Sequence, residues 1–195
     1  MNYYVDIKLL TDTEITLGFV WKKLYAQIHL ALVEVRDDNN LVSIGLSFPK
    51  HSNDRFLGDT LRIFAPTKKE LEVLDLNHWL GRLLDYLTIS AIKEVPSSVT
   101  EFVSFRRKQF KINVERLARR QAKRKGISFE EALKNYENFN EEGRKKENKL
   151  PYINIKSLSS DREMKLFIKK SEVKGQKIGL FSTYGLSIES TVPWF

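Results

Sequence analysis

The sequence predicts an α+β protein in which a ferredoxin-like βαββαβ domain over residues 1–96 precedes a smaller α+β region over residues 97–195. Before Pro96, apolar residues alternate at a spacing of two or recur at helical spacing, in the order strand, helix, strand, strand, helix, strand. After it, basic residues concentrate in one segment that predicts an arginine-rich helix. With 195 residues, 42% of them hydrophobic, the chain is long enough to bury a core.

The first strand and helix are marked by a change of period. Alternating apolar and polar side chains from Tyr3 to Leu9 predict a strand. From about Thr16 to Val35 the period becomes helical, and the apolar side chains share a narrow arc that we expect to face the core. His29 follows Ile28 and therefore lies about 100° around the helix, on the flank of the apolar arc.

Three further strands and a second helix complete the first domain. Alternation from Val42 to Phe48 and the apolar run Leu61 to Phe64 predict neighbouring strands. Thr67-Lys-Lys-Glu70 is a capping-box pattern, and the amphipathic stretch behind it, ending near Thr88, predicts the second helix. The apolar residues between Ile89 and Pro96 predict the fourth strand.

The second region begins with an extended segment and a basic helix. Residues two apart in an extended chain point to the same side, so Arg107 and Gln109 project together. Asn113 can cap a helix that Gly126 ends.

The remaining elements follow from shorter signals. Ser128-Phe-Glu-Glu131 is another capping box, which predicts a helix to about Asn138. Residues 140–149 are charged and poor in apolar side chains, as in a solvated loop or helix tail. Strand periods recur in 151–155, 164–169 and 177–182.

The net charge of +8 arises from one segment. Between Arg106 and Lys125 there are ten Lys or Arg and one acid, Glu115. Without them, the totals of 33 basic and 25 acidic residues fall to 23 and 24, a net charge of −1. Such concentration favours a polyanionic partner that meets one face of the protein.

The predicted basic helix has two distinct faces. Val114, Leu117, Ala118, Gln121 and Ala122 form a thin strip with enough apolar character to pack on another element. A solvated charged face usually carries acids at i+4 positions, which this face lacks, so we interpret it as a phosphate-binding surface. Its cations share one sector: Arg116, Arg119, Arg120, Lys123 and Arg124.

Composition excludes several function classes. There is no apolar run near the ~18 residues that span a bilayer and no signal peptide at the start, so we expect a cytoplasmic protein without membrane contact. Cysteine is absent and only His29, His51 and His78 are histidines, which argues against structural zinc and thiol chemistry. We expect no metal and no cofactor, and catalysis would use His, Ser, Tyr, Lys or carboxylates.

DNA and RNA both remain possible partners on these grounds. A helix with arginines can enter the DNA major groove, but no helix stands at helix-turn-helix spacing before it and no zipper follows. A ferredoxin-like, RRM-like body suits RNA better, and an arginine face can track phosphates where a hairpin's groove widens near its loop. Arg107 and Gln109 have the chemistry to read guanine and adenine edges, although an extended Arg and Gln are more often merely exposed.

The chain also carries an ordered set of short motifs. In this order they resemble the type I-F CRISPR repeat-RNA endoribonucleases, which cut precursor CRISPR RNA beside each repeat hairpin. The similarity covers nearly the whole chain. The motifs are Tyr4 to Ile7, His29-Leu-Ala-Leu32, Ile44-Gly-Leu-Ser-Phe-Pro49, Leu61-Arg-Ile63, Arg107-Lys-Gln109 followed by Asn113 and Glu115-Arg-Leu117, Leu150-Pro151, Ser157, Leu166-Phe-Ile168, Tyr184-Gly-Leu-Ser187 and Val192-Pro-Trp-Phe195.

The resemblance implies roles for particular residues. It implies that His29, Ser157 and Tyr184 form the catalytic group, that Arg107 and Gln109 read bases, and that the helix from Arg116 to Lys125 binds hairpin phosphates. It also places Met164 where the family has an aromatic residue that stacks under the stem. The implied partners are the CRISPR repeat RNA hairpin and the other subunits of a type I-F surveillance complex, with the chain a monomer when alone.

The implied reaction needs no metal. The RNA's own 2′-hydroxyl attacks the adjacent phosphate, and histidine has the side-chain pKa nearest neutrality for taking the proton. Within the resemblance, Ser157 holds the 2′-hydroxyl, His29 is the general base and Tyr184 orients it. Two alternatives remain: a non-catalytic RNA-hairpin-binding subunit of a guide-RNA complex, and a processing variant that serves a transposon-associated complex.

Overall fold

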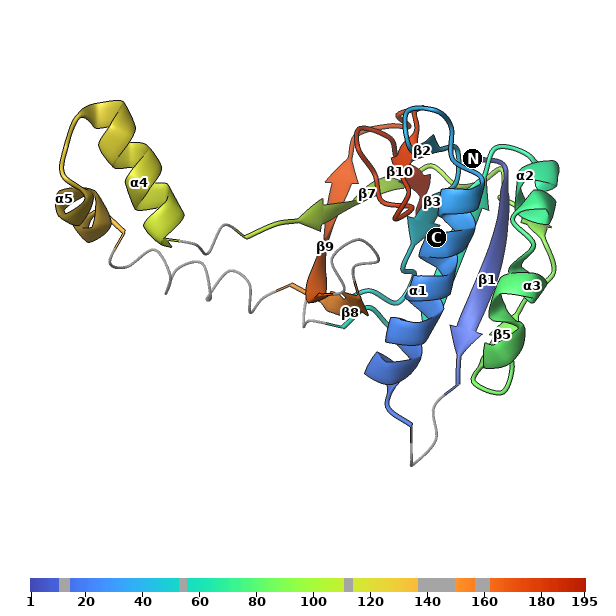
Figure 1. The fold of residues 1–195 in the computed structure, drawn as a ribbon. Coiled ribbons are helices and arrows are strands. Elements are labelled where there is room, and N and C mark those ends of the chain that lie inside the picture. The colour runs from blue at the N-terminus through green and yellow to red at the C-terminus, as the bar shows by residue number, and fades with distance from the viewer. Residues whose placement is uncertain (11–14, 53–55, 111–113, 137–149, 157–161) are drawn as a thin grey trace.

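The computed structural model describes residues 1–10, 15–52, 56–110, 114–136, 150–156 and 162–195. In these residues it has an α+β architecture with two main sheets (Figure 1). The first half contains β1 (Tyr3–Leu9), α1 (Leu17–Glu34), β2 (Leu41–Val42), β3 (Gly45–Ser47), β4 (Thr60–Ala65), α2 (Lys68–Val73), α3 (Leu76–Leu80), the 3-10 turn Gly81–Leu83, β5 (Leu87–Ile89) and β6 (Lys93–Glu94). The second half contains β7 (Phe102–Lys108), α4 (Val114–Lys125), α5 (Phe129–Lys134), β8 (Tyr152–Lys156), β9 (Glu163–Val173), β10 (Phe181–Ser182) and β11 (Val192–Pro193).

The first sheet has the strand order β3-β4-β1-β5, with β6 also paired to β1. Every pairing in it is antiparallel, and α1 joins β1 to β2 and β3 while α2 and α3 join β4 to β5. This arrangement is consistent with the predicted ferredoxin-like fold. The predicted division at residue 96 stays a prediction.

The second sheet has the strand order β11-β7-β9-β8 and is antiparallel throughout. Its inner side chains join the same buried core as those of the first sheet, with Val103, Phe105, Ile153, Leu166 and Ile168 all nearly inaccessible. Because α1 contacts β1, β8 and α3, this one helix packs against both sheets. His29 is therefore carried by an element that both sheets hold in place.

The predicted strand from Val42 to Phe48 is wrong as one element. Val42 pairs with Phe181 of β10, whereas Gly45 to Ser47 form β3 and pair with β4. A Cβ at Gly45 would lie 2.6 Å from the ring of Phe181. The predicted strand divides because β10, from the C-terminal region, pairs with the residues at its beginning.

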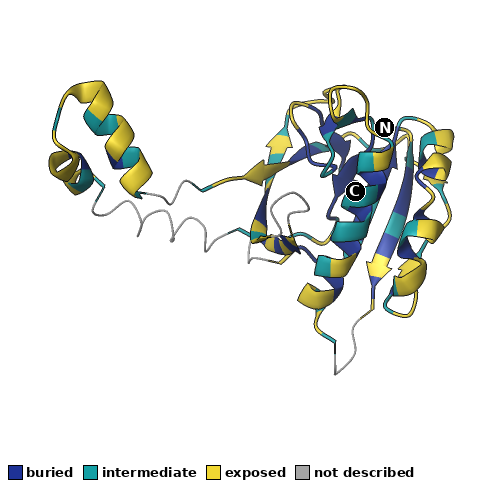
Figure 2. Cartoon of the chain, viewed as in Figure 1, coloured by how far each residue is buried: buried dark blue, intermediate teal, exposed yellow. Residues whose placement is uncertain are grey.

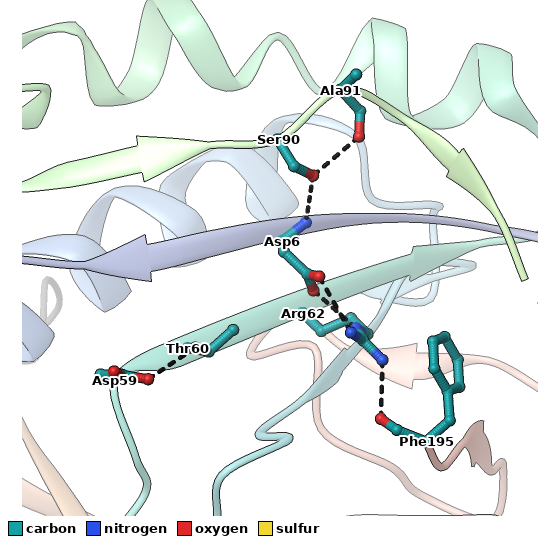
Figure 3. Close-up of polar contacts among 7 residues, drawn as sticks. All are labelled: Asp6, Asp59, Thr60, Arg62, Ser90, Ala91 and Phe195. Carbon is teal, nitrogen blue, oxygen red and sulfur yellow. Dashed lines mark hydrogen bonds and ion pairs between the residues drawn. The ribbon is translucent and has the colours of Figure 1, made fainter.

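The second helix and the fourth strand are also interrupted. Asp75 adopts a left-handed backbone with φ of 43° and caps α3 by accepting from the N–H of His78, so the predicted continuous helix breaks there. The fourth strand is two short pieces, β5 and β6. Between them, the N–H of Ser90 still donates to the Asp6 carbonyl at 2.8 Å. The Asp6 N–H, however, donates to the hydroxyl of Ser90 at 3.0 Å and not to a backbone carbonyl (Figure 3).

The later elements differ mainly in length. The helix Val114–Lys125 is followed by Gly126 with φ of 67°, while the predicted cap Asn113 lies outside the described residues. Ser128 caps α5, which ends at Lys134 and not near Asn138. Only Phe181–Ser182 of the predicted strand 177–182 is extended in a sheet, and β9 runs longer than predicted.

The C-terminus docks on the first sheet through Arg62. The guanidinium of Arg62 binds both carboxylate oxygens of Asp6, at 2.7 and 3.0 Å, and donates to the backbone oxygen of Phe195 at 3.0 Å (Figure 3). It also lies 4.1 Å from the ring centre of Phe195 and 4.6 Å from that of Tyr4.

Among the helices described, none is long and apolar enough to cross a membrane.

Candidate active site

His29 is positioned by the core packing of α1. Thr16 caps the helix by accepting from the N–H of Phe19, and the apolar arc behind it is buried as the periodicity predicts. Ile28 is fully buried, whereas His29 is half-buried at the flank of the arc. The imidazole therefore keeps contact with solvent while the backbone that carries it is held on both sheets.

Tyr184 is positioned by a tight turn after β10. Gly185 has φ of 67°, and a Cβ there would come 2.3 Å from Cγ of Leu46. The N–H of Leu46 in β3 donates to the Gly185 carbonyl at 2.8 Å. The turn thus needs glycine both for its backbone and for its close approach to β3, and this anchors the neighbouring Tyr184.

The rings of His29 and Tyr184 are stacked. Their centroids lie 4.2 Å apart and their planes differ by 3°. Nδ1 of His29 lies 2.8 Å from the carbonyl oxygen of Thr183. A carbonyl can only accept, so Nδ1 carries the hydrogen, and in the neutral ring Nε2 carries the lone pair.

Tyr25 holds the same turn from one helical turn before His29. Its hydroxyl donates to the carbonyl of Tyr184 at 2.7 Å, and the residue is fully buried. Burial, reinforced by Tyr184, raises the pKa of Tyr25 above its ordinary value, so it remains a neutral donor. The sequence showed Tyr25 four residues before His29, on the same side of the helix, but only the fold reveals its partner.

Arg107 approaches this pair from β7. Its guanidinium carbon lies 5.6 Å from the ring centre of Tyr184, and its Nη2 lies 3.7 Å from the sulfur of Met164 in β9. Arg107 remains exposed, as does Gln109 just beyond the end of β7. The fold therefore brings His29, Tyr184 and Arg107 together from three distant segments, with Met164 beside them.

Ser157 lies outside the described residues. The strand before it, β8, packs against α1 and ends at Lys156. In the part of the chain that is described, no group of three or more His, Asp or Glu side chains is arranged to hold a metal ion.

The basic helix α4 packs on α5, and Figure 1 shows this pair apart from the two sheets. Ala118 is buried. Arg119 forms an exposed ion pair with Glu115, four residues before it, at 3.6 Å, so the expectation that no acid lies at i+4 spacing from these cations is wrong at Arg119. Figure 2 shows the exposed face of the helix. The five predicted phosphate-binding residues are all exposed: Arg116, Arg119, Arg120, Lys123 and Arg124.

The arrangement of these side chains is suited to proton transfer beside a bound anion. An imidazole whose tautomer is held by a backbone carbonyl can accept a proton at Nε2, and a guanidinium nearby can bind an anion. A histidine held in this way, with an arginine beside the ring of its stacked partner, suits proton transfer on a phosphate ester. The separate basic helix suits a longer polyanion.

Comparison with known proteins gives a consistent result. Residues 4–195 match the family described as CRISPR-associated protein (Cas_Csy4). The chain is 32% identical over 196 residues to the "CRISPR-associated endonuclease Cas6/Csy4" of Escherichia coli (strain UTI89 / UPEC), covering 100% of both chains. It is 34% identical over 197 residues to the protein of the same name from Pseudomonas aeruginosa (strain UCBPP-PA14), again covering 100% of both. A solved structure described as "An RAMP protein binding different RNA substrates" aligns with 99% of each chain at 12% identity and a TM-score of 0.36, too low to bear on the fold.

Proposed function

The chain belongs to the Cas_Csy4 family of CRISPR-associated proteins, and we propose that it is a sequence- and structure-specific endoribonuclease that cleaves precursor CRISPR RNA at the base of the repeat hairpin. The relatives named as endonucleases support the nuclease activity. The observation that carries the proposal is the hydrogen bond between Nδ1 of His29 and the Thr183 carbonyl, which leaves Nε2 to accept a proton.

The proposed reaction is a transfer within the RNA. Nε2 of His29 takes the proton of the 2′-hydroxyl, whose oxygen then bonds to the adjacent phosphorus. The bond from phosphorus to the 5′-oxygen breaks, and that oxygen leaves with the electron pair. The oxygen gains one proton while His29 releases the proton that it accepted, so the proton count is unchanged. The products are a 2′,3′-cyclic phosphate and a 5′-hydroxyl, so neither water nor a metal enters the cleavage step.

The other site residues have supporting roles in this proposal. Tyr184 orients His29 through the stacked ring, and Ser157 holds the 2′-hydroxyl. Arg107 and Gln109 read base edges, and Met164 lies beside Arg107, where its thioether can contact a base.

The cations of α4 bind the hairpin's phosphates on both strands. Because such a contact does not depend on the scissile bond, it persists after cleavage and favours retention of the hairpin product. The chain would then remain with that product as one subunit of a type I-F surveillance complex.

One experiment separates the enzyme from a binding subunit. The protein is incubated with repeat RNA in EDTA, and with the same RNA carrying a 2′-deoxy residue at the scissile nucleotide. We expect cleavage of the first RNA to a cyclic phosphate end, and binding of the second without cleavage. Loss of cleavage in EDTA, or cleavage of the deoxy RNA, would contradict the mechanism. Binding of both RNAs without cleavage would leave a hairpin-binding subunit.

A further inference from the structure

The outer face of the second sheet carries a concentration of cations that the proposed site does not use. Residues of β7, β8 and β9 alternate between the core and this outer face. Arg107 points to the core side, as does its cross-strand partner Ile168. Arg106 and Lys108 point to the outer face. There Arg106 lies opposite Lys169, and Lys108 lies opposite Phe167. The cations of the outer face, all exposed, are Arg106, Lys108, Lys156, Lys165 and Lys169.

Among the residues that the structure describes, the cations of this face outnumber its acids. Glu163, at its end, is paired with Lys22 of α1. Within the described ranges, Arg106, Lys108, Lys165 and Lys169 form no ion pair. Arg106 and Lys169 lie directly opposite each other, and like charges in that position destabilise a sheet. Among the described residues the arrangement brings like charges together, and an anionic partner would relieve the repulsion.

Aromatic side chains lie among these cations. Phe167, which is buried, lies between Lys108 and Tyr152 in the cross-strand register. Its ring is 5.4 Å from that of Tyr152 and 5.1 Å from that of Phe110. Tyr152 is 40% exposed, and Nζ of Lys165 lies 4.6 Å from its ring centre. Cations beside an accessible aromatic ring are the combination that binds single-stranded nucleic acid, through phosphates and stacked bases.

We propose that this outer face, the cations Arg106, Lys108, Lys165 and Lys169 with Tyr152, binds the single-stranded RNA flank that stays joined to the hairpin after cleavage. The inference rests on the proposed function. A duplex stem offers no free base faces, so stacking on Tyr152 selects an unpaired segment. β7 carries Arg107 toward the site and Arg106 and Lys108 toward the outer face, and Figure 2 shows the end of this strand exposed. The two surfaces are therefore separated by the thickness of one sheet.

The test compares three uncleavable RNAs with a 2′-deoxy residue at the scissile nucleotide: the hairpin alone, the hairpin with the retained flank, and the hairpin with the released flank. Dissociation constants are measured at several salt concentrations. For the wild-type chain, we expect the retained flank to tighten binding about tenfold or more. The released flank should add less than about threefold.

The decisive variant replaces Arg106, Lys108, Lys165 and Lys169 with Ala. It should bind the hairpin alone as wild type does, with an unchanged thermal midpoint, but lose most of the increment from the retained flank. Tyr152→Leu keeps every charge and should reduce the increment about fivefold through lost stacking. A matched control replaces the exposed cations Lys8, Lys69, Arg82 and Lys93 with Ala and should keep the full increment.

Four results would overturn the proposal. The first is that the retained flank does not tighten binding to wild type, as expected if the face instead contacts a protein, and the second is that the released flank tightens binding equally. The third is that the decisive variant keeps the gain in affinity from the retained flank, or binds the hairpin alone more weakly than wild type. The fourth is that the control variant loses this gain in affinity. None of these results depends on cleavage. Failure of the proposed endoribonuclease activity would appear separately, as an intact all-ribose RNA.

Discussion

The site around His29 and the helix α4 position functional side chains in opposite ways. His29 has a backbone carbonyl on one ring nitrogen and a stacked ring on its face, and Tyr25 holds the backbone of that stacked residue. The cations of α4 are exposed on a helix that packs only a narrow face on α5. Proton transfer requires fixed atoms, whereas attraction to phosphates requires a density of charge, and the two regions differ accordingly.

Replacing His29 by Ala tests the first region and should have the largest effect. As the general base, His29 should contribute about 10²- to 10⁴-fold to the cleavage rate. Affinity for the hairpin should stay within about threefold of wild type, because phosphate contacts dominate it. Single-turnover cleavage and equilibrium binding measure the two quantities. His78→Ala, at an exposed histidine of α3, is the control. Full activity of His29→Ala would exclude the proposed mechanism.

Replacing the five α4 cations Arg116, Arg119, Arg120, Lys123 and Arg124 by Ala should reverse that pattern. Wild type should show a slope of log affinity against log salt of roughly −3 to −5, and the variant should lose most of it. Affinity at low salt should fall on the order of 10²-fold, with the cleavage rate at saturating RNA retained. An unchanged slope would show that α4 faces a protein or no partner.

Arg107 and Gln109 allow the comparison to be sharpened, because only Arg107 contacts the site. Arg107→Ala and Gln109→Ala should each cost about 1 to 3 kcal/mol in binding and relax discrimination at one base pair. Arg107→Ala should also slow cleavage, since Arg107 lies against Tyr184 and Met164. Competition between cognate and base-swapped hairpins measures discrimination. Equal weakening for every hairpin would indicate phosphate contacts alone.

Arg62→Met probes the C-terminal contact, which involves none of the residues of the His29 site or of α4. It removes two hydrogen bonds to Asp6 and one to Phe195. Loss of about 1 to 3 kcal/mol of stability should lower the thermal midpoint by several degrees. Deleting the last four residues should lower it similarly. Arg82→Met, at an exposed arginine, serves as the control. A midpoint equal to wild type in Arg62→Met would show that the C-terminus is held by other contacts.

The smallest expected effect is a pH dependence at His51. Burial, together with the nearby Lys170, lowers the pKa of His51 below its ordinary value of 6.5. The unfolded chain then binds a proton more readily than the folded chain, so stability should fall as pH drops below about 6.5. His51→Gln should reduce this part of the acid loss, measured by urea unfolding from pH 5 to 8, and His78→Gln should not. If His51→Gln lost as much stability at low pH as wild type does, His51 would not be a source of the acid destabilisation.

The sequence by itself determined much of the local structure. The periodicity in α1 predicted that His29 lies beside the buried arc of that helix. The alternation of an extended chain predicted that Arg107 lies on one side of its segment, as it does in β7. The strip from Val114 to Ala122 predicted which face of α4 packs. Each of these features depends on side-chain direction within one element, which the spacing of residues along the chain specifies.

Only the tertiary structure decided which elements meet. The hydrogen bond from Tyr25 to the Tyr184 carbonyl joins residues 159 positions apart, and the pairing of Val42 with Phe181 divides a strand that looks continuous in sequence. The outer basic face likewise appears only when β9 places Lys169 opposite Arg106. Periodicity within one segment records which side of it is buried, but the partner and register depend on both segments and on the core between them.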